Sequence, residues 1–162
     1  MMSLSSVSAE PMQYGESVEE AAINTLQSAC GVQVAKLEEN SLYASPFVLA
    51  VISLVGDVDW TVFLGLPQKT AVALAKNFAG FEIPFESDEL GDAVGELANV
   101  LAGDIKCRLD KQGVKESISL PCVVTDGDLR VMIPKNSSVM KICFDSPVGK
   151  LLVGVISRKK SF

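Results

Sequence analysis

Glu96 and Asn99 are the two side chains of this sequence whose types and spacing could do chemistry together. Residues three apart on an α-helix are neighbours on its surface, so the carboxylate and the amide would lie side by side. An amide carbonyl oxygen can orient a water molecule, and a carboxylate can pair with a cation. The same two residues are also typical of a solvated helix face without a function, and their spacing alone does not separate these interpretations.

The segment that carries this pair has the apolar period of an amphipathic helix. The side expected to be buried consists of Leu90, Val94, Leu97, Leu101 and Ile105. A polar side consists of Asp92, Glu96, Asn99, Gly103 and Lys106, and a row of small residues beside it consists of Gly95, Ala98 and Ala102. Glycine inside a helix costs about 1 kcal/mol relative to alanine. Gly95 and Gly103 therefore indicate either that another surface approaches this helix closely or that the helix face is bare and has no function.

The composition removes several classes of function. The chain of 162 residues has no histidine, which excludes Ser-His-Asp and Cys-His catalysis and nearly every familiar zinc site. A formal net charge of −6 and a pI of about 4.7 argue against a nucleic-acid partner. The apolar fraction of 48% predicts a folded globular protein. Any chemistry must therefore use carboxylates, amides, lysines or the groups of a partner.

The location expected for the chain is the cytoplasm. The strongest apolar run, residues 47–55, is much shorter than the roughly 20 residues that a membrane-spanning helix needs. Residues 1–13 lack the charged start and the long apolar centre of a secretion signal. The cysteines are widely spaced inside apolar patterns, so we expect four buried reduced thiols and no metal site. They are Cys30, Cys107, Cys122 and Cys143.

The order of the predicted elements indicates an α+β fold, in which three helices pack on a mostly antiparallel sheet. Helices are expected over 16–30, 67–79 and 88–109, the last capped by Ser87 or Asp88. Strands are expected over 32–38, 47–55, 58–66, 117–124, 129–133, 139–144 and 150–157. Trp60 is expected in the core, and Pro121 at the end or edge of a strand. Residues 1–14 are expected to be loosely ordered, and residues 15–162 to form a single domain.

The residues around Glu96 resemble the CheC/CheX/FliY family of chemotaxis phosphatases. That family carries Asp or Ser, Glu four residues later, Asn three residues after the Glu, and a proline further along. In this sequence these places are filled by Asp92, Glu96, Asn99 and Pro121. Residues 21–34, and the hairpin of 56–66 with the helix that follows it, are similar to the CheX branch. The likeness runs from about residue 16 to residue 158.

The first helix departs from one branch of this family. CheC-type members carry two Glu-x-x-Asn helices, whereas this chain has one. Glu20 and Asn24 on the first helix are four residues apart, which is one too many for the motif. A single site fits the CheX branch.

The resemblance implies a bacterial two-component signalling enzyme that hydrolyses the aspartyl phosphate of a CheY-like response-regulator receiver domain. The receiver would supply the magnesium ion, and the protein would need no cofactor of its own. Asn99 is implied to orient the attacking water, and Glu96 to dock the receiver through a lysine. Further residues implied to contact the receiver are Asp92, Gly95, Ala98 and Gly103. The resemblance and the β-rich second half of the chain also allow a homodimer.

Two other functions stay open from the sequence. One is a non-catalytic module that binds a receiver domain, with Glu96 used for docking. The other is a flagellar-switch-like interaction protein, in which Glu96 and Asn99 are ordinary surface residues. Catalysed loss of phosphoryl from a phosphorylated receiver would separate the enzyme from both.

Overall fold

A computed structural model describes residues 11–38, 47–127 and 133–158 of the chain. The helical elements are η1 (Pro11–Tyr14), α1 (Gly15–Cys30), α2 (Gln68–Ala79) and α3 (Asp88–Asp110). The strands are β1 (Ala35–Lys36), β2 (Phe47–Gly56), β3 (Asp59–Pro67), β4 (Glu116–Ile118), β5 (Cys122–Gly127), β6 (Ser137–Asp145) and β7 (Leu151–Arg158). The expectations for residues 1–10 and for residues 129–132 of the strand predicted over 129–133 lie outside the described residues.

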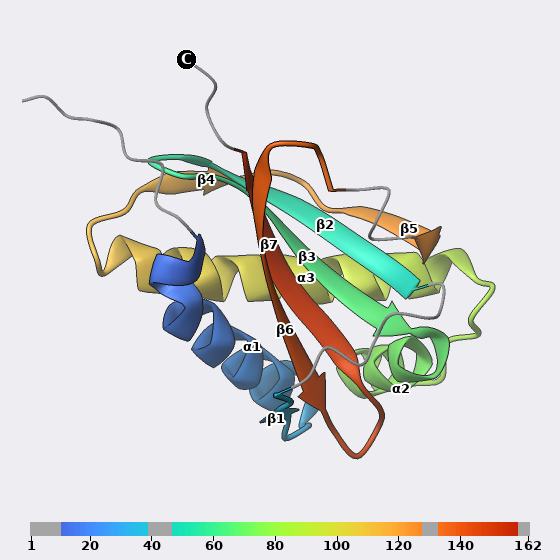
Figure 1. Cartoon of the computed structure of the whole chain (residues 1–162). Helices are drawn as coiled ribbons and strands as arrows, with labels where there is room; N and C mark the ends of the chain where they lie inside the picture. Colours follow the sequence, from blue (N-terminus) through green and yellow to red (C-terminus); the bar gives the residue numbers. More distant parts are fainter. Residues whose placement is uncertain (1–10, 39–46, 128–132, 159–162) are drawn as a thin grey trace, which may run out of the picture.

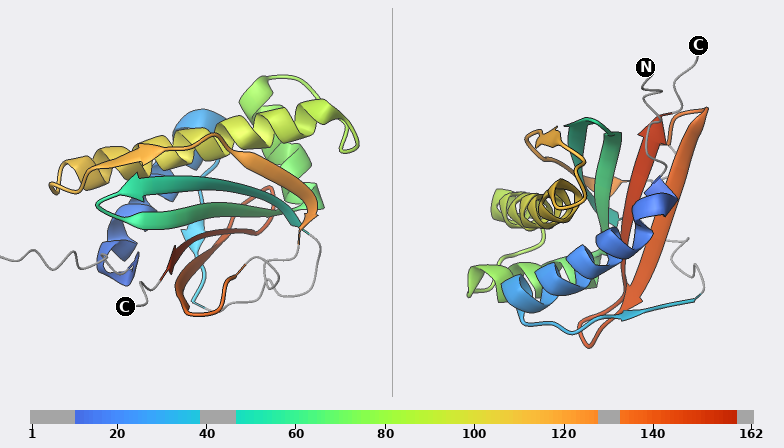
Figure 2. Two further views of the ribbon diagram at one scale, coloured as in Figure 1. Left: turned by 90° about the horizontal axis from the view of Figure 1, so that it is seen from above. Right: turned by 90° about the vertical axis from the view of Figure 1, so that its left-hand side faces the viewer.

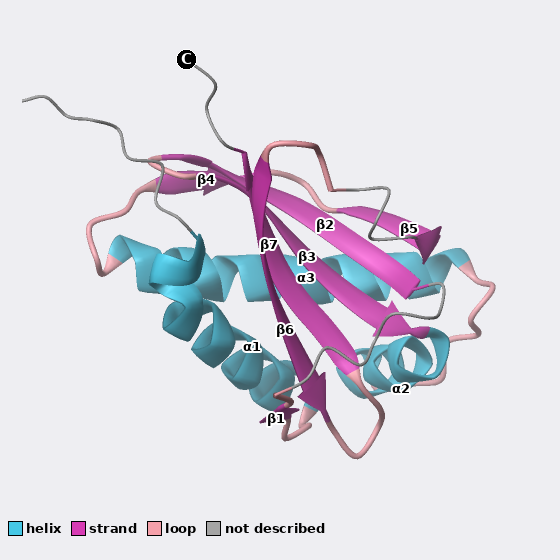
Figure 3. Ribbon diagram, in the orientation of Figure 1, coloured by secondary structure: helices cyan, strands magenta, loops and turns pink. Residues whose placement is uncertain are grey.

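The strands form one antiparallel sheet in the order β1-β6-β7-β3-β2-β4, and β5 also pairs with β2. The helices α1, α2 and α3 lie on the same face of this sheet (Figures 1 and 2). The turned views in Figure 2 show the helices and the strands as two layers, and Figure 3 distinguishes the helices from the strands by colour. The predicted α+β class, with helices packed on a mostly antiparallel sheet, is confirmed.

The hairpin of β2 and β3 lies in the interior of the sheet, and its side chains alternate between the two faces. Trp60, Val62 and Leu64 join the large core under the helices, as the period of two predicts. Phe63, which lies between them on the opposite face, is nevertheless buried with three residues of β6 and β7, namely Cys143, Leu152 and Ile156. β3 is therefore packed on both of its faces.

The ends of the helices agree with the sequence signals. Gly31 and Gly80 follow α1 and α2 with φ of 65° and 86°, the left-handed region that favours glycine. Ser87 is the N-cap residue of α3, but its hydroxyl donates to the Pro84 carbonyl at 2.7 Å and makes no cap hydrogen bond. The turn before α3 is thus stabilised by the side chain that was expected to cap the helix.

Three predicted elements are different in the structure. The strand expected over 32–38 is only the two-residue β1. The strand expected over 117–124 is divided into β4 and β5, with residues 119–121 between them. Residues 11–14 were expected to be loosely ordered, but they form η1, and the Tyr14 ring lies 5.9 Å from the Trp60 ring. These short segments were misjudged because tertiary contacts determine where they begin and end.

The cysteines are free thiols, as expected, but only Cys30 and Cys143 are buried. Cys107 and Cys122 are exposed, which corrects the expectation for these two. Burial raises the pKa of the Cys30 thiol to about 11. Within the parts of the chain that the structure describes, no helix combines the length and the apolar character needed to cross a membrane.

Candidate functional site

The long helix α3 presents Glu96 and Asn99 to solvent on the same side. The apolar residues predicted to anchor this helix are all buried: Leu90, Val94, Leu97, Leu101 and Ile105. Asp92 is also exposed, and Gly103 and Lys106 are half-buried. The helical period therefore places the carboxylate and the amide on the outer surface of α3, with the core beneath them. The structure confirms their exposure and proximity in the helix.

The small residues of α3 face the protein's own sheet. A Cβ atom added to Gly95 would lie 3.3 Å from Val123 Cγ2 and 3.6 Å from Pro121 Cγ. Ala98 is 2% exposed and belongs to the core. Gly95 and Ala98 thus have a packing role within the protein, because their small size lets the segment that leads into β5 approach α3 closely. Gly103 is different, because an added Cβ atom would meet nothing within 4 Å.

An open groove with a volume of about 870 Å³ runs beside the first half of α3. Asp92 and Glu96 line one wall, and Pro121 and Val123 line the other. Its remaining lining residues include three more carboxylates, those of Glu86, Asp88 and Asp126. The groove therefore carries negative charge next to Glu96, which favours a partner surface with basic groups.

The C-terminal half of α3 carries an ion pair close to a buried carboxyl group. Lys106 Nζ lies 3.0 Å from Asp110 Oδ2, and this hydrogen bond raises the pKa of the lysine. Glu116 at the start of β4 is buried, and its two carboxyl oxygens have no hydrogen-bond partner. Burial raises the pKa of Glu116, and the negative charge of Asp110 adds to this effect. Sequence reasoning missed Glu116, because nothing in its neighbours marks this position as buried.

The family model for "Chemotaxis phosphatase CheX" matches residues 48–145, which include most of β2 and all of β3, α2 and α3. This match covers more than half of the chain. The protein belongs to the CheX family. The CheY-P phosphatase CheX of Thermotoga maritima is 28% identical over 85 residues, which are 52% of this chain and 55% of that relative. The chain thus matches little more than half the length of this relative.

Solved structures of CheX and FliY proteins share the fold. Chemotaxis protein CheX from Vibrio vulnificus superposes with a TM-score of 0.75 at 18% identity, over 88% of this chain and 95% of that one. A CheX-CheY-BeF3-Mg²⁺ complex from Borrelia burgdorferi gives a TM-score of 0.73 at 21% identity, over 90% and 98%. The FliY structure from Thermotoga maritima gives 0.65 at 18% identity, over 97% and 92%.

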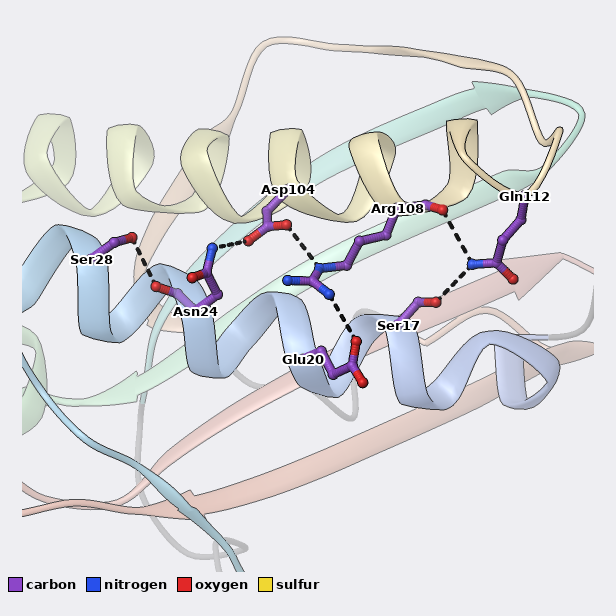
Figure 4. A network of polar contacts seen from close by, with 7 residues as sticks. All are labelled: Ser17, Glu20, Asn24, Ser28, Asp104, Arg108 and Gln112. Atoms are coloured by element: carbon purple, nitrogen blue, oxygen red, sulfur yellow. Dashed lines mark hydrogen bonds and ion pairs between the residues drawn. The ribbon is translucent and has the colours of Figure 1, made fainter.

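In this CheX-family chain, Glu20 and Asn24 of α1 join α1 to α3 (Figure 4). Asn24 Nδ2 donates to Asp104 Oδ2 at 2.7 Å. Arg108 bridges the two helices, with Nη1 2.8 Å from Glu20 Oε2 and Nε 2.9 Å from Asp104 Oδ1. Gln112 Nε2 donates to the Ser17 hydroxyl at 2.9 Å, one turn further along. Glu20 and Asn24 therefore make a structural clamp, and the sequence missed this because each partner is 80 or more residues away.

The structure contains no candidate metal centre of its own within the described residues, where no three His, Cys, Asp or Glu side chains gather closely enough to hold an ion.

Proposed function

We propose that this protein hydrolyses the aspartyl phosphate of a CheY-like response-regulator receiver domain. The observation that carries the proposal is the exposure of Glu96 and Asn99 on one side of α3, in a chain that belongs to the CheX family. The name of the Thermotoga maritima relative, CheY-P phosphatase CheX, supports the substrate class. The Borrelia burgdorferi complex, which contains CheX, CheY, BeF3 and Mg²⁺, supports a receiver as the partner.

The reaction needs one well-placed water molecule. The water oxygen forms a bond to phosphorus while the bond from phosphorus to the aspartyl oxygen breaks. The products are the free carboxylate and inorganic phosphate, which carries the proton that the water loses. The receiver and its magnesium ion would stabilise the charge on the phosphoryl oxygens, so the task left to this protein is positioning.

Asn99 is the proposed water-positioning residue. Its amide oxygen can accept a hydrogen bond from the attacking water, as the amide of glutamine does in GTPases. An amide does not titrate, so it holds the water in the same way across the physiological pH range. The absence of histidine from the sequence agrees with a mechanism that requires no titrating base.

Glu96 is the proposed docking residue. It lies three residues before Asn99 on the exposed side of α3, so a cation of the receiver that pairs with it would fix the rotation of the helix over the phosphoryl group. Asp92 lies one turn earlier on the same side and would make a peripheral contact. Gly103, which has open space above it, would allow close approach at the other end.

A panel of phosphorylated receivers tests the proposal. With the cognate receiver, we expect phosphoryl loss much faster than spontaneous decay, measured as inorganic phosphate released over time. Asn99→Ala is expected to lower kcat roughly a hundredfold, as the removal of one positioned hydrogen-bonding group typically does. Gln27→Ala removes an exposed amide from α1 and serves as the matched control.

The separate roles of Glu96 and Asn99 are tested by measuring KM and kcat separately. Glu96→Ala is expected to raise KM for the phosphorylated receiver, while Glu89→Ala, on the first turn of the same helix, is expected to leave KM unchanged. An Asn99→Ala variant with the wild-type kcat would contradict the mechanism. Binding without hydrolysis across the panel would instead indicate a non-catalytic receiver-binding module.

A further inference from the structure

Leu120 lies between β4 and β5, and its apolar side chain is exposed to solvent. It is 90% exposed, the largest value among the exposed large apolar residues of the described chain. The residue before it is nevertheless tied to β2 by two hydrogen bonds. Ser119 N donates to the Ser53 carbonyl at 2.9 Å, and Ser53 N donates to the Ser119 hydroxyl oxygen at 2.9 Å.

Two further constraints fix the backbone on either side of this leucine. The Ser119 hydroxyl also donates to the Leu120 carbonyl at 3.1 Å. Pro121 follows immediately, and its ring fixes its own φ and restricts the backbone of the residue before it. A leucine with an ordered backbone and a solvated side chain loses little chain entropy when another surface covers it.

The position of Leu120 along α3 follows from two contacts. Pro121 lies against Gly95 at one end, and Glu116 lies close enough to Lys106 at the other for their charges to affect each other's pKa. The five extended steps between 116 and 121 span about 16 Å, and the eleven helical steps between 95 and 106 also span about 16 Å. Residues 116–121 and residues 95–106 of α3 therefore run antiparallel and span the same length.

This register places Ser119 and Leu120 level with residues 97–99 of α3. Asn99 is four residues after Gly95, so it lies on the side of the helix that faces this segment. Leu120 thus flanks the Glu96–Asn99 pair, on the opposite side from α1.

We infer that Leu120 is the apolar anchor of the receiver-docking surface, covered by the receiver surface that surrounds the aspartyl phosphate. This inference rests on the proposed function, which it extends from the two polar residues to the source of binding energy. Glu96 and Asn99 offer hydrogen bonds and charge, and exposed ion pairs contribute little affinity. An apolar side chain that becomes buried contributes more, and a rigid one contributes most.

The test compares Leu120→Ser with Phe81→Ser, which removes another exposed apolar side chain, in the loop between α2 and α3 and outside the lining of the α3 groove. Binding to a BeF3-activated receiver is measured by calorimetry, and KM and kcat are measured with the phosphorylated receiver. Leu120→Ser is expected to raise Kd and KM roughly tenfold or more, the effect of leaving one leucine unburied, with kcat preserved. Leu120→Met is expected to restore binding to near the wild-type value.

Thermal unfolding checks that the variants are folded, and the exposure of Leu120 predicts an unchanged Tm. The inference is overturned if Leu120→Ser binds the receiver as tightly as the wild type does, or if Phe81→Ser weakens binding equally. A protein that binds the receiver through Leu120 but hydrolyses nothing would overturn the proposed function alone. A protein that binds no receiver would overturn both.

Discussion

Gly95 of α3 lies directly against Val123 of β5, close enough that an added Cβ atom would be 3.3 Å from the valine Cγ2. The contact joins the helix that carries Glu96 and Asn99 to the segment that carries Leu120. A larger residue at position 95 would push the two apart. Gly103, two turns further along the helix, has no such neighbour.

Gly95→Leu is therefore expected to lower the free energy of unfolding by about 1–3 kcal/mol, the usual cost of overpacking. Gly103→Ala is expected to raise it by about 1 kcal/mol, because alanine is favoured over glycine inside a helix. Urea denaturation of the two variants measures both effects. Combining Gly95→Leu with Val123→Ala should recover part of the loss, and no recovery would mean that the strain lies elsewhere.

The ion pairs of Arg108 predict a salt-dependent clamp between α1 and α3. Arg108→Ala should destabilise the protein by about 1 kcal/mol at low salt, and by less in high salt, because the side chain is partly exposed and its ion pairs are screened. Denaturation at two sodium chloride concentrations provides the measurement. Lys76→Ala, which removes a more exposed ion pair with Glu82, is the control and should change stability little at either concentration. Equal losses in low and high salt would indicate that Arg108 acts through packing.

The buried Glu116 predicts a stability that falls as pH rises. Burial raises its pKa in the folded protein, so the unfolded chain loses this proton first. Above the ordinary glutamate pKa of about 4.3, folding therefore carries the cost of keeping a carboxyl group away from water. This cost reaches its full value once pH exceeds the raised pKa of the folded state.

Glu116→Gln should accordingly be more stable than the wild type at pH 7, and this difference should disappear near pH 4. Free energies of unfolding from urea titrations at the two pH values test the prediction, with Glu89→Gln as the exposed control. A variant that is less stable than the wild type at pH 7 would show that the Glu116 carboxylate is paired in solution. Lys106 and Lys115 are the cations close enough to do this.

The cysteines predict two classes of thiol. Cys107 and Cys122 are exposed and should react with a thiol reagent in the native protein at pH 8. Cys30 and Cys143 are buried and should react only after unfolding. The pKa of about 11 for Cys30 leaves roughly one thiolate in a thousand at that pH, which slows its reaction further. Mass spectrometry of the labelled protein gives the number of reactive thiols, and four fast thiols would contradict the burial of Cys30 and Cys143.

The sequence predicted the elements whose signals are local. The period of α3, the glycines that end α1 and α2, and the alternation of the β2–β3 hairpin each depend on residues a few positions apart. It could not predict that Phe63 would be buried on the face away from the helices, because the residues that cover it come from β6 and β7.

The sequence likewise predicted only part of the candidate site. Glu96 and Asn99 were found from their spacing and from the likeness to a family. The inward orientation of Gly95 and Ala98 was missed, because it depends on where β5 passes. Leu120 was also missed, since an exposed leucine and a buried one are identical in sequence, and only the break between β4 and β5 distinguishes them.

The clamp between α1 and α3 limits how this site could be moved into another protein. A synthetic peptide of residues 88–110 would contain both Glu96 and Asn99, yet an isolated helix of this length is marginal in water. It would also lack the neighbours that orient it, Arg108's partner Glu20 on α1 and the Ser119–Pro121 segment. The smallest part of the protein that could be transferred together with the site is therefore α3 with α1 and the β2–β5 edge, which is most of the domain.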